Sequence, residues 1–184
     1  NKVHLFWGDE RCVAPHDPDS NYRMVRISLL DHIDIPRENI HRIFGESNPP
    51  EEAQRYSEEI LQHVPLENNL PKFDWILLGL GNDGHTASLF PNSENLKISG
   101  KFCVVATHPV TGQKRVSLTL PVLENAGRLS FLVTNKKKNQ ILKKILSDKN
   151  ISSQYPASLL YGNRNDAEWW LDWDAAELLH LAKG

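Results

Sequence analysis

Cysteine is scarce in this sequence. Cys12 and Cys103 are the two cysteines among 184 residues, and they lie far apart. Neither belongs to a C-x-x-C pair or to a Cys/His spacing typical of metal ligands, so the pattern does not indicate a disulfide scaffold. We therefore expect a protein of a reducing compartment, the cytoplasm.

The sequence also lacks a long apolar run and an excess of charge of either sign. No run approaches the roughly 20 apolar residues that span a membrane. The 21 basic and 23 acidic residues give a formal net charge of −2. Without a strongly electropositive field, neither nucleic acid nor an anionic membrane is an expected partner. We expect a small-molecule substrate instead, while the oligomeric state cannot be predicted from these features.

The length and composition predict one globular domain over residues 1–184. The chain is 40% hydrophobic and 24% charged, which allows a single sizeable core. It begins Asn1-Lys2-Val3-His4, without an initiator methionine or a signal-peptide pattern. No internal repeat, linker or low-complexity segment divides it.

Apolar runs and helical patterns alternate along the chain. Short apolar runs predict strands at 3–7, 73–78, 102–106, 116–120 and 129–133, and the run at 73–78 is typical of a strand covered on both faces. Helical spacing and start signals predict helices at 20–32, from Pro49, at 135–146 and at 175–181. The tryptophans Trp169, Trp170 and Trp173 are expected to pack in or against the core. This alternation predicts an α/β fold with a mostly parallel, Rossmann-like sheet and helices on both faces.

A glycine-rich stretch after the second of these apolar runs, Gly79 to Pro91, contains G-x-G-x-x-G. A dinucleotide-binding protein would place an acidic residue about 20 positions further on, at the end of the next strand. That strand ends in Ala106-Thr107-His108-Pro109, without an acid, so we disfavour a nucleotide cofactor.

The same stretch carries His85, whose side-chain type titrates near neutral pH. We expect His85 to transfer protons, and Asp83 to orient its ring or else to serve the tight turn. The backbones of Gly81, Asn82 and Gly84 are expected to approach the substrate closely, since glycine removes the steric obstacle and exposes N–H groups.

Several motifs in the same order resemble the 6-phosphogluconolactonase family. They are Phe6-Trp7-Gly8-Asp9-Glu10-Arg11, Asp19-Ser20-Asn21, Gly79 to Pro91, and Lys114-Arg115-Val116-Ser117-Leu118-Thr119. The resemblance covers essentially the whole chain. It implies hydrolysis of 6-phospho-D-glucono-1,5-lactone to 6-phosphogluconate in the oxidative pentose phosphate pathway, and a fold related to glucosamine-6-phosphate deaminase.

The deaminase is the main alternative, and a non-catalytic sugar-phosphate sensor is another. In the deaminase, a glutamate precedes the proline of the glycine loop, whereas this chain has Phe90 there, and Arg11 follows Asp9-Glu10 where the deaminase has tyrosine. Both departures favour the lactonase.

A lactone is already electrophilic, so we expect no metal and no cofactor. His85 is predicted to remove a proton from the attacking water. Arg11 and Arg115 are predicted to bind the phosphate, with Lys114 as a weaker candidate, because arginine pairs well with oxygen atoms. Asp9 is a candidate substrate ligand. For Asp9 and Glu10, a catalytic pair and a structural role that fixes Arg11 both remain open.

The resemblance finally implies an upstream strand and a Gly-Gly-Ser-Thr-Pro-type loop that helps to hold the phosphate. No such loop occurs before Val3. We therefore expect an N-terminally incomplete lactonase domain, with an apolar edge or face of its sheet left uncovered.

Overall fold

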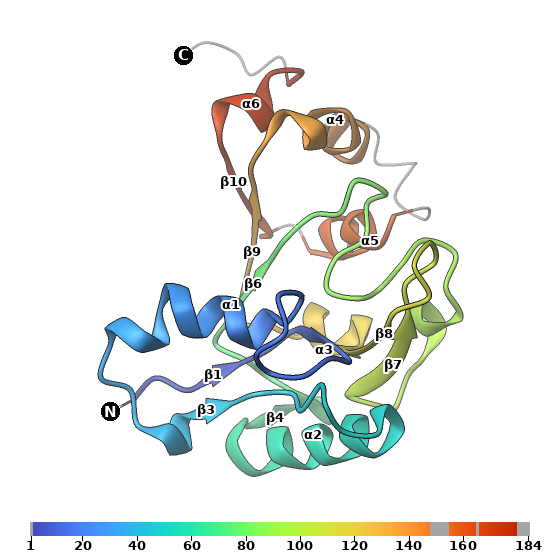
Figure 1. The fold of residues 1–184 in the computed structure, drawn as a ribbon. Coiled ribbons are helices and arrows are strands. Elements are labelled where there is room, and N and C mark those ends of the chain that lie inside the picture. The colour runs from blue at the N-terminus through green and yellow to red at the C-terminus, as the bar shows by residue number, and fades with distance from the viewer. Residues whose placement is uncertain (1, 148–154, 165, 180–184) are drawn as a thin grey trace.

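A computed structural model describes residues 2–147, 155–164 and 166–179 (Figure 1). Its strands are β1 (Leu5–Phe6), β2 (Asp9–Arg11), β3 (Ile40–His41), β4 (Leu66–Glu67), β5 (Leu70–Pro71), β6 (Trp75–Leu78), β7 (Cys103–Thr107), β8 (Lys114–Leu118), β9 (Arg128–Val133) and β10 (Glu168–Leu171). Its α-helices are α1 (Asn21–Ser28), α2 (Pro49–His63), α3 (Leu120–Glu124), α4 (Asn139–Ser147), α5 (Pro156–Asn163) and α6 (Trp173–Ala176). Across these described ranges, no helix is long and apolar enough to cross a membrane.

The predicted α/β fold is confirmed by a parallel sheet in the order β10-β9-β6. Both neighbours run parallel to β9, with Leu78 opposite Phe131 and Leu171 opposite Val133. β1 and β3 form a second parallel pair. Because parallel strands end at the same edge, the glycine-rich segment that follows β6 emerges at the carboxyl edge of this sheet, where α/β proteins bind ligands.

The fold also contains a separate antiparallel sheet in the order β2-β8-β7. β7 and β8 form a hairpin, and β2 pairs with β8 so that Arg11 lies opposite Arg115. The predicted strands are present, but apolar patterning does not encode strand direction, so the sequence did not separate this sheet from the parallel one.

Helix α2 begins and packs as predicted. Pro49 and Pro50 occupy its first turn, Glu51 and Glu52 follow, and the side chain of Asn48 caps the backbone N–H of Glu51 at 3.4 Å. Its buried face includes Ala53, Tyr56 and Ile60, as the spacing indicates.

The helix predicted at 20–32 is shorter: α1 ends at Ser28, Leu29 leaves the helical conformation, and a 3₁₀ turn follows over Leu30–His32.

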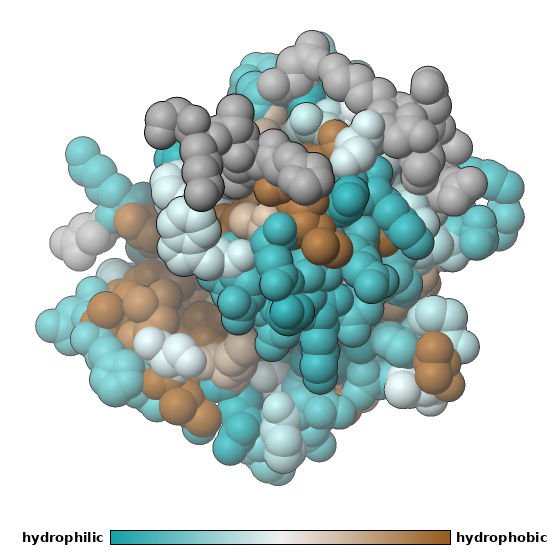
Figure 2. Space-filling model, turned by 90° about the horizontal axis from the view of Figure 1, so that it is seen from above, coloured by the Kyte–Doolittle hydropathy of each residue, from teal (hydrophilic) through white to brown (hydrophobic). Residues whose placement is uncertain are grey.

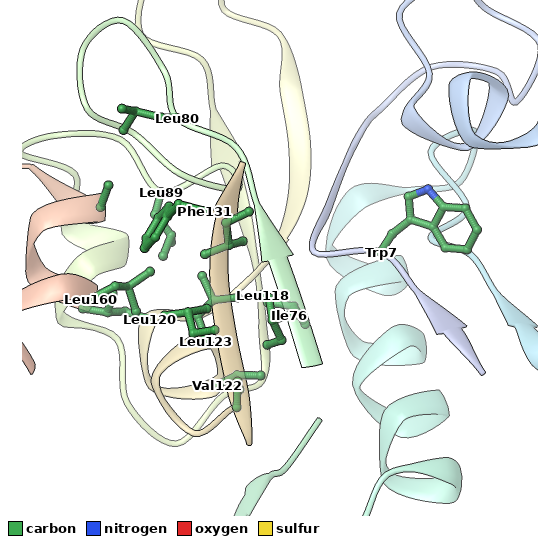
Figure 3. Packing of buried hydrophobic residues seen from close by; sticks show 14 of the residues in the cluster. Trp7, Ile76, Leu80, Leu89, Leu118, Leu120, Val122, Leu123, Phe131 and Leu160 are labelled. Carbon is green, nitrogen blue, oxygen red and sulfur yellow. The ribbon is translucent and has the colours of Figure 1, made fainter. Parts of the chain in front are cut away.

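One part of the core lies on one side of the parallel sheet. Phe131 of β9, Leu89 and Leu160 of α5 cluster there, whereas Trp7 lies apart, on the other side of β6 (Figure 3). Trp169 stacks on Phe131 with ring centroids 4.2 Å apart. A second part of the core lies between α2 and the strands β7 and β8, where Tyr56 and Ile60 are fully buried.

The opposite face of this sheet is exposed, which corrects two predictions. Leu77 of β6 is exposed, so β6 is not covered on both faces, and neither Trp170 nor Trp173 is buried. Side chains alternate between the faces of a strand, and within the described ranges only one face meets helices. A view from above shows hydrophobic patches at the surface among more extensive hydrophilic areas (Figure 2). The exposed apolar residues of this sheet face are Trp75, Leu77, Leu132 and Trp170.

Candidate active site

A cavity of about 580 Å³ lies where the segment after β6 meets β2 and β8. Its walls come from four separate parts of the chain, so it exists only in the folded protein. The lining residues are Gly8, Asp9, Arg11, Asn21, Leu77 to Asp83, His85 to Ala87, His108, Val110, Arg115 and Lys138.

His85 and Asp83 form a close pair in this cavity. Nδ1 of His85 lies 2.5 Å from Oδ1 of Asp83, and the backbone N–H of His85 donates to the same oxygen at 3.2 Å. Burial acts to raise the pKa of Asp83, but the hydrogen bonds from His85 outweigh it and hold this pKa at about 2. An ionised carboxylate only accepts hydrogen bonds, so Nδ1 of His85 must donate. In the neutral ring, Nε2 is then free to accept a proton.

The glycine loop places this pair. A Cβ at Gly81 would lie 2.1 Å from Nδ1 of His85, so a larger residue would displace the imidazole. Gly84 has φ of +82°, and a Cβ there would lie 2.6 Å from the ring of Tyr155. Gly84 therefore lets the loop turn and pack against the N-terminal end of α5, and it does not line the cavity.

Two arginines face the cavity from neighbouring strands. Arg11 of β2 and Arg115 of β8 are register partners and both line the cavity. Their Nε atoms are buried without a hydrogen-bond partner among the described residues. Burial lowers the pKa of Arg115, and the positive charge of Arg11 lowers it further. Two guanidinium cations on one wall are suited to an anion that carries several oxygen atoms.

Asp9 is held by hydrogen bonds from two segments. The hydroxyl of Ser88 donates to Oδ2 of Asp9 at 2.6 Å, and Nδ2 of Asn21 donates to Oδ1 at 3.2 Å. Nη1 of Arg115 also reaches the hydroxyl of Ser88, at 3.5 Å. Asp9 therefore fixes the wall that carries both arginines.

Glu10 has a structural position next to Asp9. Its carboxylate is buried, does not line the cavity, and accepts from the backbone N–H groups of Arg11, Asn21 and Tyr22 at 2.7–2.8 Å. Burial raises the pKa of Glu10 although these hydrogen bonds oppose the rise. Because Asn21 and Tyr22 begin α1, Glu10 caps this helix and fixes Arg11 in relation to it. Of the two roles left open for Glu10, the geometry fits the structural one.

The fold brings most of the predicted site residues together, with two exceptions. Lys114 and Gly84 do not line the cavity. Lys114 precedes Arg115 on β8, so strand alternation turns it to the other face, where its Nζ donates to the hydroxyl of Thr107 at 2.8 Å. The cavity includes these predicted residues: Asp9, Arg11, Gly81, Asn82, Asp83, His85 and Arg115.

Besides Thr86 of the glycine-rich stretch, three further polar residues enter the cavity without having been singled out as site residues. Asn21 belongs to a recognised motif, and Lys138 belongs to a lysine run for which solvent exposure was the expected role. His108 comes from the turn between β7 and β8, and burial lowers its pKa, followed by the effect of the Arg115 charge. No local pattern around His108 distinguishes it from an ordinary turn residue.

The aromatic ring of Phe90 packs against both His85 and Arg115. Its buried ring lies 4.9 Å from the imidazole of His85 and 5.7 Å from the guanidinium of Arg115, measured to the ring centroid. A carboxylate is thus missing at the position where the deaminase has its glutamate, and an aromatic ring packs against His85 instead.

Within the described ranges, the histidine, cysteine and carboxylate side chains that lie close enough to share a metal ion are outside this cavity. They are His41, Glu59 and His63, none of which lines its wall.

Comparisons with known proteins agree with this arrangement. The sequence profile of the family described as glucosamine-6-phosphate isomerases/6-phosphogluconolactonase matches residues 1–170. A 6-phosphogluconolactonase of Aggregatibacter actinomycetemcomitans is 46% identical over 177 residues, which are 96% of this chain and 74% of that protein.

Solved structures give the same result. The crystal structure of a devB protein superposes with a TM-score of 0.90 at 44% identity, covering 97% of this chain and 75% of that one. The 6-phosphogluconolactonase of Trypanosoma brucei gives a TM-score of 0.83 at 31% identity, covering 95% and 73%. The chain therefore belongs to the glucosamine-6-phosphate isomerase/6-phosphogluconolactonase family and groups with its lactonases.

Proposed function

We propose that this protein hydrolyses 6-phospho-D-glucono-1,5-lactone to 6-phosphogluconate, the lactone-opening step of the oxidative pentose phosphate pathway. Family membership and the identity to lactonases support the reaction class. The observation that carries the mechanism is the 2.5 Å Asp83–His85 pair, which shares one cavity with Arg11 and Arg115.

His85 acts as the general base in this proposal. Its Nδ1–H donates to Asp83, so Nε2 removes a proton from water as the water oxygen bonds to the lactone carbonyl carbon. When the tetrahedral intermediate collapses, the bond between this carbon and the ring oxygen breaks, and the imidazolium returns its proton to the ring oxygen. General acid-base catalysis of this kind contributes about 10²- to 10⁴-fold.

Arg11 and Arg115 bind the phosphate of the substrate. Both residues line the cavity, and strand pairing fixes the positions of both charges. Lys138 adds a third positive charge to the cavity wall. The backbones of Gly81 and Asn82 line the same cavity and approach the sugar.

Phe90 favours the lactonase over the aminosugar deaminase. Ring opening of an aminosugar calls for a second acid-base group beside the histidine, whereas the lactone already presents an electrophilic carbonyl. The apolar ring against His85 leaves Asp83 as its carboxylate hydrogen-bond partner within the described residues.

The test is an assay of the purified chain with freshly generated 6-phosphogluconolactone, measured against the spontaneous rate of hydrolysis. We expect faster loss of lactone, and we expect His85→Asn to fold normally but to retain less than about a tenth of the wild-type kcat. A parallel assay measures ammonia release from glucosamine 6-phosphate. Ammonia release without lactone loss would refute the lactonase, and a fully active His85→Asn variant would refute the proposed base.

A further inference from the structure

A second group of titratable side chains lies at the amino-terminal side of the fold. His41 belongs to β3, while Glu59 and His63 lie four residues apart on α2 and so share a face of that helix. One ligand atom from each of the three lies within 4.8 Å of the others. None of these residues belongs to the cavity described above, and the lactonase mechanism uses none of them.

The distances within this group suit a shared metal ion. Oε1 of Glu59 lies 2.6 Å from Nδ1 of His41 and 3.7 Å from Nδ1 of His63. Two ligand atoms on a tetrahedral zinc ion, each about 2.0–2.1 Å from the metal, are roughly 3.3 Å apart. Each of the two distances to Glu59 would change by less than 1 Å to reach this separation, while the ligand atoms of His41 and His63 lie within 4.8 Å of each other. Nδ1 of His63 also lies 2.9 Å from the backbone carbonyl oxygen of Glu59, a contact that a bound ion at Nδ1 would replace. Two imidazoles and one carboxylate are donors that zinc accepts readily.

Neighbouring side chains form hydrogen bonds with His41 and Glu59, as side chains around a metal site do with the metal ligands. Nε2 of His41 lies 2.9 Å from Nδ1 of His4, which leaves Nδ1 of His41 on the side of Glu59. Nη1 of Arg55 lies 3.5 Å from Oε2 of Glu59, so the other carboxylate oxygen remains directed at the histidines. Partners of this kind orient metal ligands.

Burial and aromatic packing also fix the position of His41. His41 is buried, and the ring of Phe6 stacks on it with centroids 4.2 Å apart and an interplanar angle of 10°. His63, by contrast, is exposed, which leaves a path for an ion from solvent and room for water as a further ligand.

We propose that His41, Glu59 and His63 bind a divalent transition-metal ion, with Zn²⁺ as the best match, and that the ion clamps β3 to the C-terminal part of α2. The site is structural, because it is built from different residues than the catalytic cavity. Its presence or absence does not bear on the lactonase activity.

The test is calorimetric titration of the metal-stripped chain with ZnCl₂, combined with thermal melting. We expect saturable binding of one Zn²⁺ per chain and a higher melting temperature with the metal. His63→Ala and Glu59→Gln should each weaken the affinity at least about tenfold, in line with the loss of a ligand. Because His63 is exposed, its variant is expected to fold, and circular dichroism checks this.

Two variants serve as controls. His16→Ala removes an exposed histidine outside the group, and His85→Asn removes the histidine of the catalytic cavity. Both should bind Zn²⁺ like the wild type. The proposal is overturned if the wild type does not bind, if His63→Ala and Glu59→Gln bind unchanged, or if His85→Asn loses the binding. In each of these outcomes, the group is an ordinary histidine–carboxylate cluster.

Discussion

At the scale of single residues, the candidate site depends on the hydrogen bond between the Asp83 carboxylate and the imidazole of His85. Asp83 stays ionised because the hydrogen bonds from His85 hold its pKa at about 2, below its ordinary value of 3.8. The hydrogen bonds to the Asp83 carboxylate therefore contribute stability at pH values above 3.8, and this contribution is lost as the pH falls towards 2. Throughout the neutral range, Asp83 accepts from Nδ1 and keeps Nε2 available.

Asp83→Asn should test this role. The amide has nearly the same shape but no charge, so it stabilises the positive charge that develops on the ring during proton transfer less well. We expect kcat at neutral pH to fall by at least about tenfold. The measurement is steady-state kinetics of both proteins. An unchanged kcat would show that Asp83 serves only the turn.

Arg115 and Lys114 provide a matched pair for the phosphate. They are adjacent on β8, but Arg115 faces the cavity and Lys114 faces Thr107. Arg115→Ala should weaken competitive inhibition by 6-phosphogluconate by about 1.5–3 kcal/mol, the usual contribution of a hydrogen bond to a charged group. Lys114→Ala should leave inhibition nearly unchanged.

Gluconate, which lacks the phosphate, distinguishes phosphate binding from general damage to the site. Its inhibition should not respond to Arg115→Ala. If both inhibitors weaken equally, or if Lys114→Ala has the larger effect, the assignment of Arg115 to the phosphate is wrong.

At the scale of elements, β9 shows how one strand divides between core and solvent. Leu129 is 0% exposed, whereas Leu132, three residues later on the same strand, is 58% exposed. The helices cover only the face on which Leu129, Phe131 and Val133 are buried. The free energy of burial is therefore concentrated on one face of the parallel sheet.

Replacing each leucine by alanine should separate the two faces. Leu129→Ala removes buried methyl groups and leaves a cavity, so the free energy of unfolding should fall by about 2–5 kcal/mol. Leu132→Ala should change it by no more than about 1 kcal/mol, because its side chain is already in contact with water. Urea unfolding curves of both variants give the comparison. Similar losses for both would mean that the exposed face is covered in solution.

At the scale of the whole molecule, the active-site cavity lies where the two sheets meet. Ser88 follows the parallel strand β6, and its hydroxyl donates to Asp9 of β2 in the antiparallel sheet. The backbone N–H of Ser88 donates to the hydroxyl of Ser117 on β8 at 3.1 Å. A buried residue thus links the segment that carries His85 to the wall that carries the arginines.

Ser88→Ala should weaken this link. Asp9 loses a buried hydrogen bond, so we expect the free energy of unfolding to fall by about 1–3 kcal/mol. KM should rise because the phosphate-binding wall is less well fixed, while the imidazole pair remains in place. Thermal melting and steady-state kinetics test this, with the exposed Ser99→Ala as a control. An unchanged KM would show that the two parts of the site are positioned independently.

The sequence by itself determined those features that depend on neighbours along the chain. The start of α2 follows from Asn48, Pro49 and Pro50, since capping and the fixed φ of proline act within one helical turn. The strands around β6 and β9, and the proximity of Asp83 to His85, likewise follow from short-range patterns. The order of the motifs was sufficient to identify the family.

Only the tertiary structure decided which face of each element is covered and which distant segments meet. Periodicity separates Leu77 from Leu78 and Lys114 from Arg115, but it does not tell which of the two faces a partner element will cover. His108 and Lys138 enter the cavity through chain reversals that no local pattern encodes. The cluster of His41 with Glu59 and His63 arises in the same way, because it joins a strand to a helix that only long-range packing brings together.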